Sequence, residues 1–81
     1  MSNNPEPSMS APRVVHSNPA ILGGVPVFVN TRVPVRTLFD HLEAGDTLDD
    51  FLRDLPGVSR EQAVAALEMG REMIEAHAPA A

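Results

Sequence analysis

A switch from a strand pattern to a helix pattern constrains the fold of this chain more than any other feature. The β-prone run 26–29 gives way at Asn30 to apolar residues at helical spacing. Pro34 suits a first helical turn, and Gly45 suits the residue just past a helix end. The segment therefore predicts a strand that leads directly into a helix over residues 34–44.

Two further helix starts follow, and each has the pattern of a capping box. In such a box a Ser or Thr side chain and the residue three positions later cap each other's backbone N–H groups. Thr47 with Asp50 forms one box, and Ser59 with Gln62 forms the other. The two predicted helices cover residues 48–55 and 59–76.

Three short β-prone pieces precede the first helix: Val14-Val15, Ile21-Leu22 and Val25 to Val29. The pair Gly23-Gly24 is placed to turn between the last two pieces, as in a hairpin. Pro26 has no N–H to donate to a sheet, so its strand is expected at a sheet edge that is open to another chain.

Apolar residues on the inward side of these elements predict the core. Gly70 lies inside the last predicted helix and favours a close crossing with another element there. The predicted core residues are Val27, Phe28, Leu38, Leu42, Phe51, Leu52, Val64 and Leu67.

The predicted fold class is mainly α, with a short N-terminal β-hairpin followed by a three-helix, homeodomain-like helix-turn-helix. The chain has 81 residues, which suffices for one domain, expected over residues 13–77. The polar, proline-rich tail 1–12 and the end 78–81 are expected to be disordered. A core this small gains from oligomerisation, so we expect a homodimer through the N-terminal β region.

The composition argues against catalytic and metal-binding functions. Without cysteine, the chain has no disulfide, thiolate zinc site or cysteine nucleophile. His16, His41 and His77 are too scattered to form a metal-binding pair on one helix. We therefore predict no enzyme, no catalytic residue, no metal and no cofactor. The N-terminus lacks a signal-peptide pattern and no apolar run approaches ~18 residues, which predicts a cytoplasmic protein and no membrane span.

Charge divides the chain into a basic and an acidic part. Residues 1–37 carry three arginines against Glu6, a balance of +2, whereas residues 38–81 carry three arginines against ten acids, a balance of −7. Acids at the start of the second predicted helix are explained by capping and by the helix dipole. The acids expected to bind a partner are Asp49, Asp50, Asp54, Glu61, Glu68 and Glu72, and the arginines expected to bind DNA are Arg13, Arg32 and Arg36.

The last two predicted helices have the spacing of a DNA-binding helix-turn-helix, joined by the turn 55–58. The outer face of the later helix carries a row of glutamates that phosphate would repel. Shape therefore favours DNA and charge opposes it. Thr31-Arg32 lies at the strand-to-helix junction, where Arg32 is expected to pair with an acid of the second helix, with an external anion as the alternative.

With these residues in place, the segment from Val14 to about Ile74 resembles the prokaryotic family called domain of unknown function 433. The residues that carry the resemblance are Asn18-Pro19, Gly23-Gly24, Pro26 to Val29, Thr31-Arg32, Val33 to Val35, Gly45, Thr47 to Asp54, Pro56 and Glu61 to Leu67. Asn30 stands where the family usually has glycine, and asparagine tolerates positive φ better than most residues. Met69 replaces a frequent aromatic residue.

The resemblance implies a dimeric, homeodomain-like protein that is frequently the antitoxin of a type II toxin–antitoxin pair. The toxin in such pairs is a small PIN-like nuclease, and the antitoxin often represses its own operon. We therefore expect an antitoxin-like protein whose partners are a cognate nuclease toxin and operator DNA. The alternatives are a stand-alone helix-turn-helix transcriptional regulator and a structural adaptor that uses the edge strand alone.

Overall fold

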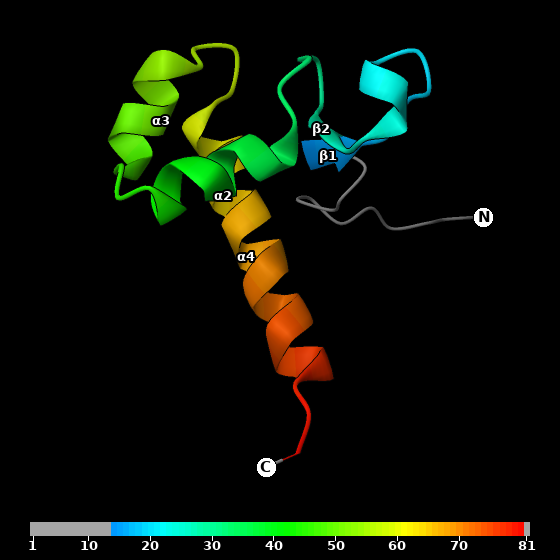
Figure 1. Cartoon of the computed structure of the whole chain (residues 1–81), viewed down its shortest axis with the longest axis vertical. Helices are drawn as coiled ribbons and strands as arrows, with labels where there is room; N and C mark the ends of the chain where they lie inside the picture. The colour runs from blue at the N-terminus through cyan, green and yellow to red at the C-terminus, as the bar shows by residue number, and fades with distance from the viewer. Residues whose placement is uncertain (1–13, 81) are drawn as a thin grey trace, which may run out of the picture.

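The computed structural model describes residues 14–80, and these form a small β-hairpin followed by three helices. Strand β1 (Val15–His16) pairs antiparallel with β2 (Val27–Phe28), and helices α2 (Val35–Glu43), α3 (Leu48–Asp54) and α4 (Arg60–His77) follow (Figure 1). The predicted fold class is confirmed. The predicted tail 1–12 lies outside the described residues.

The helix boundaries fall within about one residue of the prediction because local signals set them. Both capping boxes are formed, with all four hydrogen bonds at 3.0 Å. At the end of α2, Gly45 has φ 95°. Its N–H donates to the Leu42 carbonyl, and the Asp46 N–H donates to the His41 carbonyl, which is the Schellman pattern. The predicted C-terminal glycine is therefore confirmed.

The hairpin differs from the prediction in its first strand. Val15 lies opposite Phe28 in β1–β2, whereas Ile21-Leu22 is not a strand. Leu22–Gly24 instead forms a single 3-10 turn in which all three residues have positive φ. Burial explains the choice, because Val14 at the start of the pairing is wholly buried and Leu22 is 46% exposed. The Gly-Gly pair therefore turns the chain within the β1–β2 connection and not between two adjacent strands.

Strand β2 is also not the open edge that Pro26 predicted. On one side it pairs with β1, and on the other its Phe28 N–H donates to the Val33 carbonyl at 3.0 Å. The Pro26 carbonyl accepts from the Val35 N–H at 3.0 Å, and Val27 lies opposite Pro34. Proline lacks a donor but keeps its acceptor, so the chain that returns after the turn covers this edge.

The turn between β2 and α2 has the conformation that the sequence suggested. Asn30 has φ 67°, so asparagine supplies the left-handed residue that glycine would otherwise provide. The Thr31 hydroxyl donates to the Phe28 carbonyl at 2.8 Å and accepts from the Val33 N–H at 3.0 Å. Thr31 therefore fixes the turn that carries Arg32.

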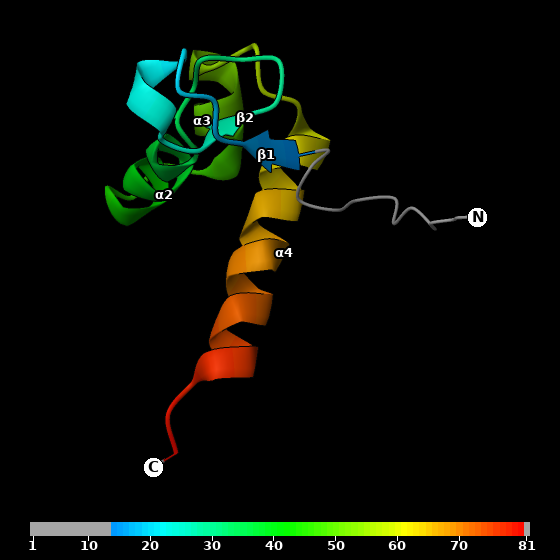
Figure 2. The same cartoon turned by 90° about the vertical axis from the view of Figure 1, so that its right-hand side faces the viewer.

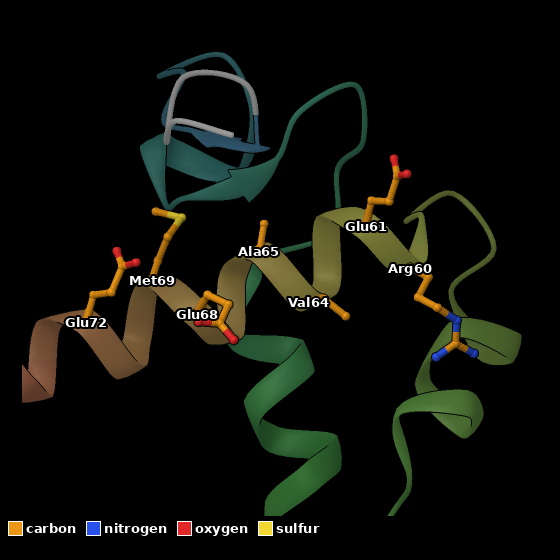
Figure 3. Close-up of a pocket in the computed structure, with 7 residues that line it drawn as sticks. All are labelled: Arg60, Glu61, Val64, Ala65, Glu68, Met69 and Glu72. Carbon is orange, nitrogen blue, oxygen red and sulfur yellow. The ribbon is translucent and has the colours of Figure 1, made fainter. Parts of the chain in front are cut away.

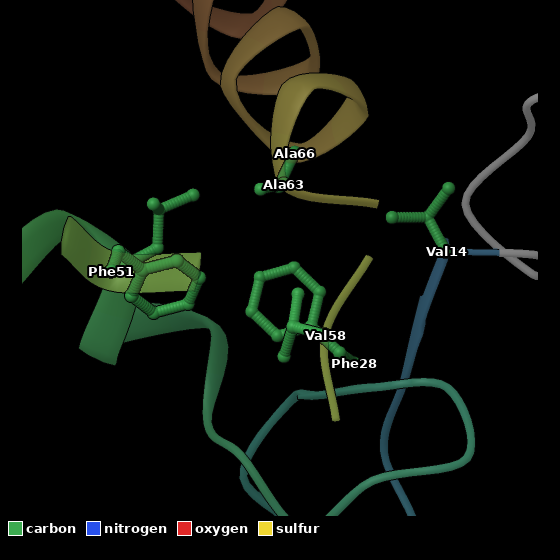
Figure 4. Packing of buried hydrophobic residues seen from close by; sticks show 7 residues of the cluster. Val14, Phe28, Phe51, Val58, Ala63 and Ala66 are labelled. Atoms are coloured by element: carbon green, nitrogen blue, oxygen red, sulfur yellow. The ribbon is translucent and has the colours of Figure 1, made fainter. Parts of the chain in front are cut away.

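The core lies where the hairpin, α2 and α3 meet the first half of α4 (Figure 4). The Phe28 and Phe51 rings pack at the centre, with centroids 6.3 Å apart. Of the predicted core, Val27, Phe28, Leu38 and Phe51 are buried, and Leu42, Leu52 and Leu67 pack half-buried against them.

The predicted register of α4 is partly wrong. Val64, expected in the core, is 41% exposed, and the buried residues of this helix are Ala63 and Ala66. Small side chains let the helix backbone approach the two phenylalanine rings, where a larger residue would not fit a close-packed interior. Val14 and Val58 complete the core and were not predicted.

Helix α4 extends beyond the rest of the structure in both views (Figures 1 and 2). Its residues 71–77 are all exposed, and we call this segment the arm and residues 14–70 the body. Gly70 lies at their junction beneath Phe39 of α2, as the predicted crossing suggested. A Cβ at Gly70 would lie 3.8 Å from the Phe39 Cζ, which is an ordinary contact distance.

Candidate partner-binding surface

The acids of α3 have different surroundings, and Asp50 belongs to the helix cap. Its carboxylate accepts from the Thr47 backbone N–H at 3.0 Å and lies 2.6 Å from the Arg53 Nη2. These hydrogen bonds, the Thr47 backbone bond first, lower the pKa of Asp50 from 3.8 to about 2. Asp50 therefore has a structural role, which leaves less of its charge for a partner.

Asp49 and Asp54 lie on the exposed surface of the same helix. Asp49 forms an ion pair with Arg60 at the first turn of α4, so it links the two helices across the turn. Asp54 makes no ion pair within residues 14–80. Asp54 is thus the α3 carboxylate with the fewest interactions inside the described chain.

The three predicted glutamates of α4 share one surface. A hollow of about 630 Å³ lies along this helix. Figure 3 shows the residues that line it, with apolar side chains between charged ones. We call it the acidic face of α4; it is lined by Arg60, Glu61, Val64, Ala65, Glu68, Met69 and Glu72. Glu68 pairs with Arg71, whereas Glu61 and Glu72 form no ion pair within the described residues.

Ala65 was expected on this outward face, but Val64 was not, because it was assigned to the core. Val64, Ala65 and Met69 lie at helical spacing between the glutamates. The position of Val64 could have been inferred from Glu61: in a helix, residues three, four and seven positions after an outward residue lie on the same side, and here these are Val64, Ala65 and Glu68. The surface is therefore amphipathic and not uniformly acidic.

The predicted basic residues are only partly brought together. Arg32 is exposed and lines a hollow of about 500 Å³ with His16, Asn30 and Thr31. Arg36 is exposed in the first turn of α2. Within residues 14–80 neither arginine makes an ion pair, so the expected internal pairing of Arg32 is wrong. Arg13 lies outside the described residues.

The start of α4, which would enter the major groove in a DNA-binding helix-turn-helix, carries opposed charges. Arg60 is engaged by Asp49, and Glu61 lies beside it. Phosphate is repelled by the glutamates further along this helix. The charges on α4 therefore favour a basic partner over DNA.

Comparison with known protein families identifies the family of this chain. The sequence model of the family described as "Protein of unknown function (DUF433)" matches residues 15–68, which is more than half of the chain. The chain belongs to this family. Searches of curated proteins and of solved structures found no match. The DUF433 match includes the hairpin, α2, α3 and the first half of α4, and it ends before the arm begins.

Two other features of this DUF433 protein bear on its chemistry. His41 Nδ1 lies 3.0 Å from Asp46 Oδ2 without the geometry of a hydrogen bond, and its ring meets Phe51 edge-on, with centroids 5.4 Å apart. Across residues 14–80, no three His, Asp or Glu side chains gather closely enough to hold a metal ion. In the same residues no helix has the length and apolar character of a membrane span.

Proposed function

We propose that this protein is an antitoxin-like component of a type II toxin–antitoxin pair, and that it binds and neutralises a small, basic, PIN-like nuclease in the cytoplasm. The observation that carries the proposal is the acidic face of α4, where Glu61, Glu68 and Glu72 surround exposed Val64 and the half-buried side chains of Ala65 and Met69. Membership of the DUF433 family supports it. The proposed protein acts by binding and is not an enzyme.

The chemistry of this face suits a protein partner. Carboxylates at its rim attract a basic surface, which raises the association rate and rejects acidic competitors. Val64 and Met69 supply apolar area, which most protein interfaces bury at their centre. Asp49 and Asp54 extend the negative charge onto α3.

We further propose that the protein forms a homodimer through its N-terminal β region. Because β2 is hydrogen bonded on both sides, the strand available for pairing between copies is β1. The small core of the described body supports this proposal, since domains of this size often gain stability from association. Light scattering at micromolar concentration tests it, and a monomer of 8.7 kDa would contradict it.

Co-expression with the neighbouring gene tests the antitoxin function. The wild-type chain should restore growth to cells that express the toxin and should co-purify with it. The double variant Glu61→Gln/Glu72→Gln should weaken both effects because it removes from the acidic face two carboxylates that form no ion pair within residues 14–80. The matched control is Asp40→Asn/Glu43→Gln, which removes two exposed carboxylates from α2.

Two results would count against this function. One is failure of the folded wild-type chain to rescue growth or to co-purify with a folded neighbour. The other is equal loss of binding in the α4 variant and in the α2 control, which would show that binding depends on the net charge of the protein and not on the acidic face of α4.

The alternative function is a stand-alone helix-turn-helix regulator of transcription, and one observation favours it. Arg32 and Arg36 are exposed beside the start of α2 without an ion pair inside the described chain. DNA from upstream of the gene should then bind in a salt-sensitive manner, and Arg13→Gln/Arg32→Gln/Arg36→Gln should abolish binding. If Arg60→Gln abolishes it instead, α4 is the reading helix and the electrostatic argument fails.

A further inference from the structure

One hollow of the body is lined by hydrogen-bond donors and by no acid. It has a volume of about 500 Å³, and we call it the turn hollow; it is lined by His16, Ile21, Asn30, Thr31 and Arg32. His16 belongs to β1, Ile21 precedes the 3-10 turn, and the other three residues form the turn between β2 and α2. The fold therefore brings polar groups from separate segments to one place.

The donors of the turn hollow are not used inside the described chain. Within residues 14–80, the side chains of His16, Asn30 and Arg32 form no hydrogen bond. The backbone N–H groups of Asn30 and Arg32 have no acceptor in these residues either. Thr31 differs, because its hydroxyl donates to the Phe28 carbonyl. A ligand would replace only water at these donors.

The charge around the turn hollow favours an anion. Residues 14–39, which supply its whole lining, contain no Asp or Glu, and Arg32 and Arg36 give them a balance of +2. Residues 40–80 carry ten acids against three arginines, a balance of −7. Within residues 14–80, no carboxylate forms an ion pair with Arg32 or His16. An anion is therefore attracted to this part of the described chain and repelled from α4.

The turn that carries most of these donors is anchored to the body. The Phe28 carbonyl accepts from the Thr31 N–H at 3.0 Å and from the Thr31 hydroxyl at 2.8 Å. Gln62 Nε2 of α4 donates to the Val29 carbonyl at 3.0 Å. A ligand would thus order exposed side chains on a backbone that is already fixed, which lowers the entropic cost of binding.

Donors on three residues favour phosphate over carboxylate. The planar guanidinium of arginine can bind either group through two parallel hydrogen bonds. Such a bidentate contact with Arg32 would engage both oxygens of a carboxylate. A phosphate monoester offers three terminal oxygens in a tetrahedral arrangement, so that His16 and Asn30 also find acceptors.

We propose that the turn hollow binds a phosphate group, which Arg32 holds through a bidentate contact and to which His16 and Asn30 donate further hydrogen bonds. A free phosphate ester and a single phosphate of a DNA backbone offer the same chemistry. The inference does not rest on the proposed antitoxin function, because the turn hollow shares no residue with the acidic face of α4.

Titration of the full-length, isotope-labelled chain with inorganic phosphate, followed by nuclear magnetic resonance, tests the site. Sodium chloride keeps the ionic strength constant, so that screening does not change during the titration. The backbone amide signals of Asn30, Thr31 and Arg32 should shift and saturate, with a Kd on the order of 1–10 mM for so small and exposed a ligand. The signals of residues 61–72 should stay in place.

Two variants and a matched control locate the site. Arg32→Gln should weaken phosphate binding at least about tenfold, because it removes both the charge and the bidentate donor. His16→Ala should weaken it about twofold to fivefold through the loss of one donor. Arg36→Gln removes the same charge from an exposed residue that does not line the hollow, and should change binding less than about twofold. Circular dichroism should show wild-type unfolding midpoints, since all three residues are exposed.

Adenosine monophosphate and a DNA duplex of about 12 base pairs distinguish the two sources of phosphate. If the ligand is a free ester, the nucleotide should bind at least as tightly as inorganic phosphate, and the duplex should leave the three amide signals unchanged. If the ligand is a DNA phosphate, the duplex should bind most tightly. Arg36→Gln should then weaken binding of the duplex but not of inorganic phosphate, because contacts to DNA spread over neighbouring phosphates.

Three results would overturn the proposal. The first is a set of phosphate-induced shifts that do not saturate. The second is equal weakening of phosphate binding by Arg32→Gln and Arg36→Gln, which would show attraction to the net charge of this region and no specific site. The third is saturable shifts confined to residues outside the turn hollow.

Discussion

Helix α4 runs without a break from the body into the arm, yet its two parts place their apolar residues in opposite ways. In the body, Ala63 is wholly buried, whereas Ile74 in the arm is largely exposed. Residue type alone would reverse this order, since isoleucine buries more apolar area than alanine. Burial along α4 is therefore set by what lies opposite the helix. Packing within the described residues explains why a small side chain stands at Ala63. No contact within them explains why a large apolar side chain stands at Ile74.

The largest effect should come from the centre of the body. Phe51→Ala removes a wholly buried ring that packs against Phe28 and His41, and it should cost about 3–5 kcal/mol of unfolding free energy. That loss is comparable to the whole stability of a domain this small. Ile74→Ala in the arm should change the unfolding free energy by less than about 0.5 kcal/mol. Urea denaturation followed by circular dichroism measures both.

A cooperative transition near the wild-type midpoint for Phe51→Ala would contradict the described core. A large loss for Ile74→Ala would instead show that the arm is packed in solution, either on the body or on a second copy. The two cases separate by the dependence of the midpoint on protein concentration.

The next effect concerns the residue that fastens the start of α4 to the hairpin. Gln62 accepts from the Ser59 N–H through Oε1 and donates from Nε2 to the Val29 carbonyl at 3.0 Å. Gln62→Glu keeps the capping box and adds favourable charge at a helix start, worth about 0.3–1 kcal/mol. It also removes the donor and turns a carboxylate toward the half-buried Val29 carbonyl, at a cost of about 1–3 kcal/mol.

Loss of the hydrogen bond to the Val29 carbonyl should therefore outweigh the favourable charge at the helix start, and Gln62→Glu should lower the unfolding free energy by about 1 kcal/mol. Ser59→Ala is the matched control, because it removes the cap and leaves the bond to Val29 in place. A rise in stability for Gln62→Glu would mean that this bond does not form and that only the cap acts at this position.

Features that depend on neighbouring residues could be predicted from the sequence, whereas contacts between distant segments could be predicted less well. The capping boxes and Gly45 depend on residues within four positions of one another, so their outcomes matched the prediction. The first strand depends on which segment reaches Phe28 across the hairpin, and no local signal separates Val15 from Ile21. Both are β-prone, and the buried position of Val14 decides between them.

The candidate site shows the same limit. The spacing placed Glu61, Glu68 and Glu72 on one outward face, which the structure confirms for their position on α4. It could not show that Val64 belongs to that face, because hydrophobicity favours valine over alanine for a core position. Likewise, exposure of the arm depends on where the body ends, and a periodic pattern in one helix contains no such information.

A smaller effect of opposite sign is expected at the junction of body and arm. Gly70→Ala should raise the unfolding free energy by about 0.5–1 kcal/mol, because alanine favours the helix more than glycine does. The new methyl group would meet Phe39 at 3.8 Å and 3.9 Å, which requires no displacement. Thermal unfolding by circular dichroism measures the change. A loss of stability would show that α2 and α4 approach more closely in solution than in this structure.

The smallest effect on the unfolding free energy is expected at acidic pH and concerns Asp50 in α3, which belongs to the body. The pKa of Asp50 is about 2 in the folded chain, below the ordinary 3.8, so the unfolded chain binds this proton first as the pH falls. The contribution of Asp50 is therefore complete above about pH 4 and is lost between about pH 4 and 2. It should be modest because the side chain is solvent-exposed and screened. Urea midpoints between these pH values should fall less steeply for Asp50→Asn, which still caps but does not titrate, than for the wild type. Equal slopes for the wild type and Asp50→Asn would show that ionisation of Asp50 does not stabilise the helix cap.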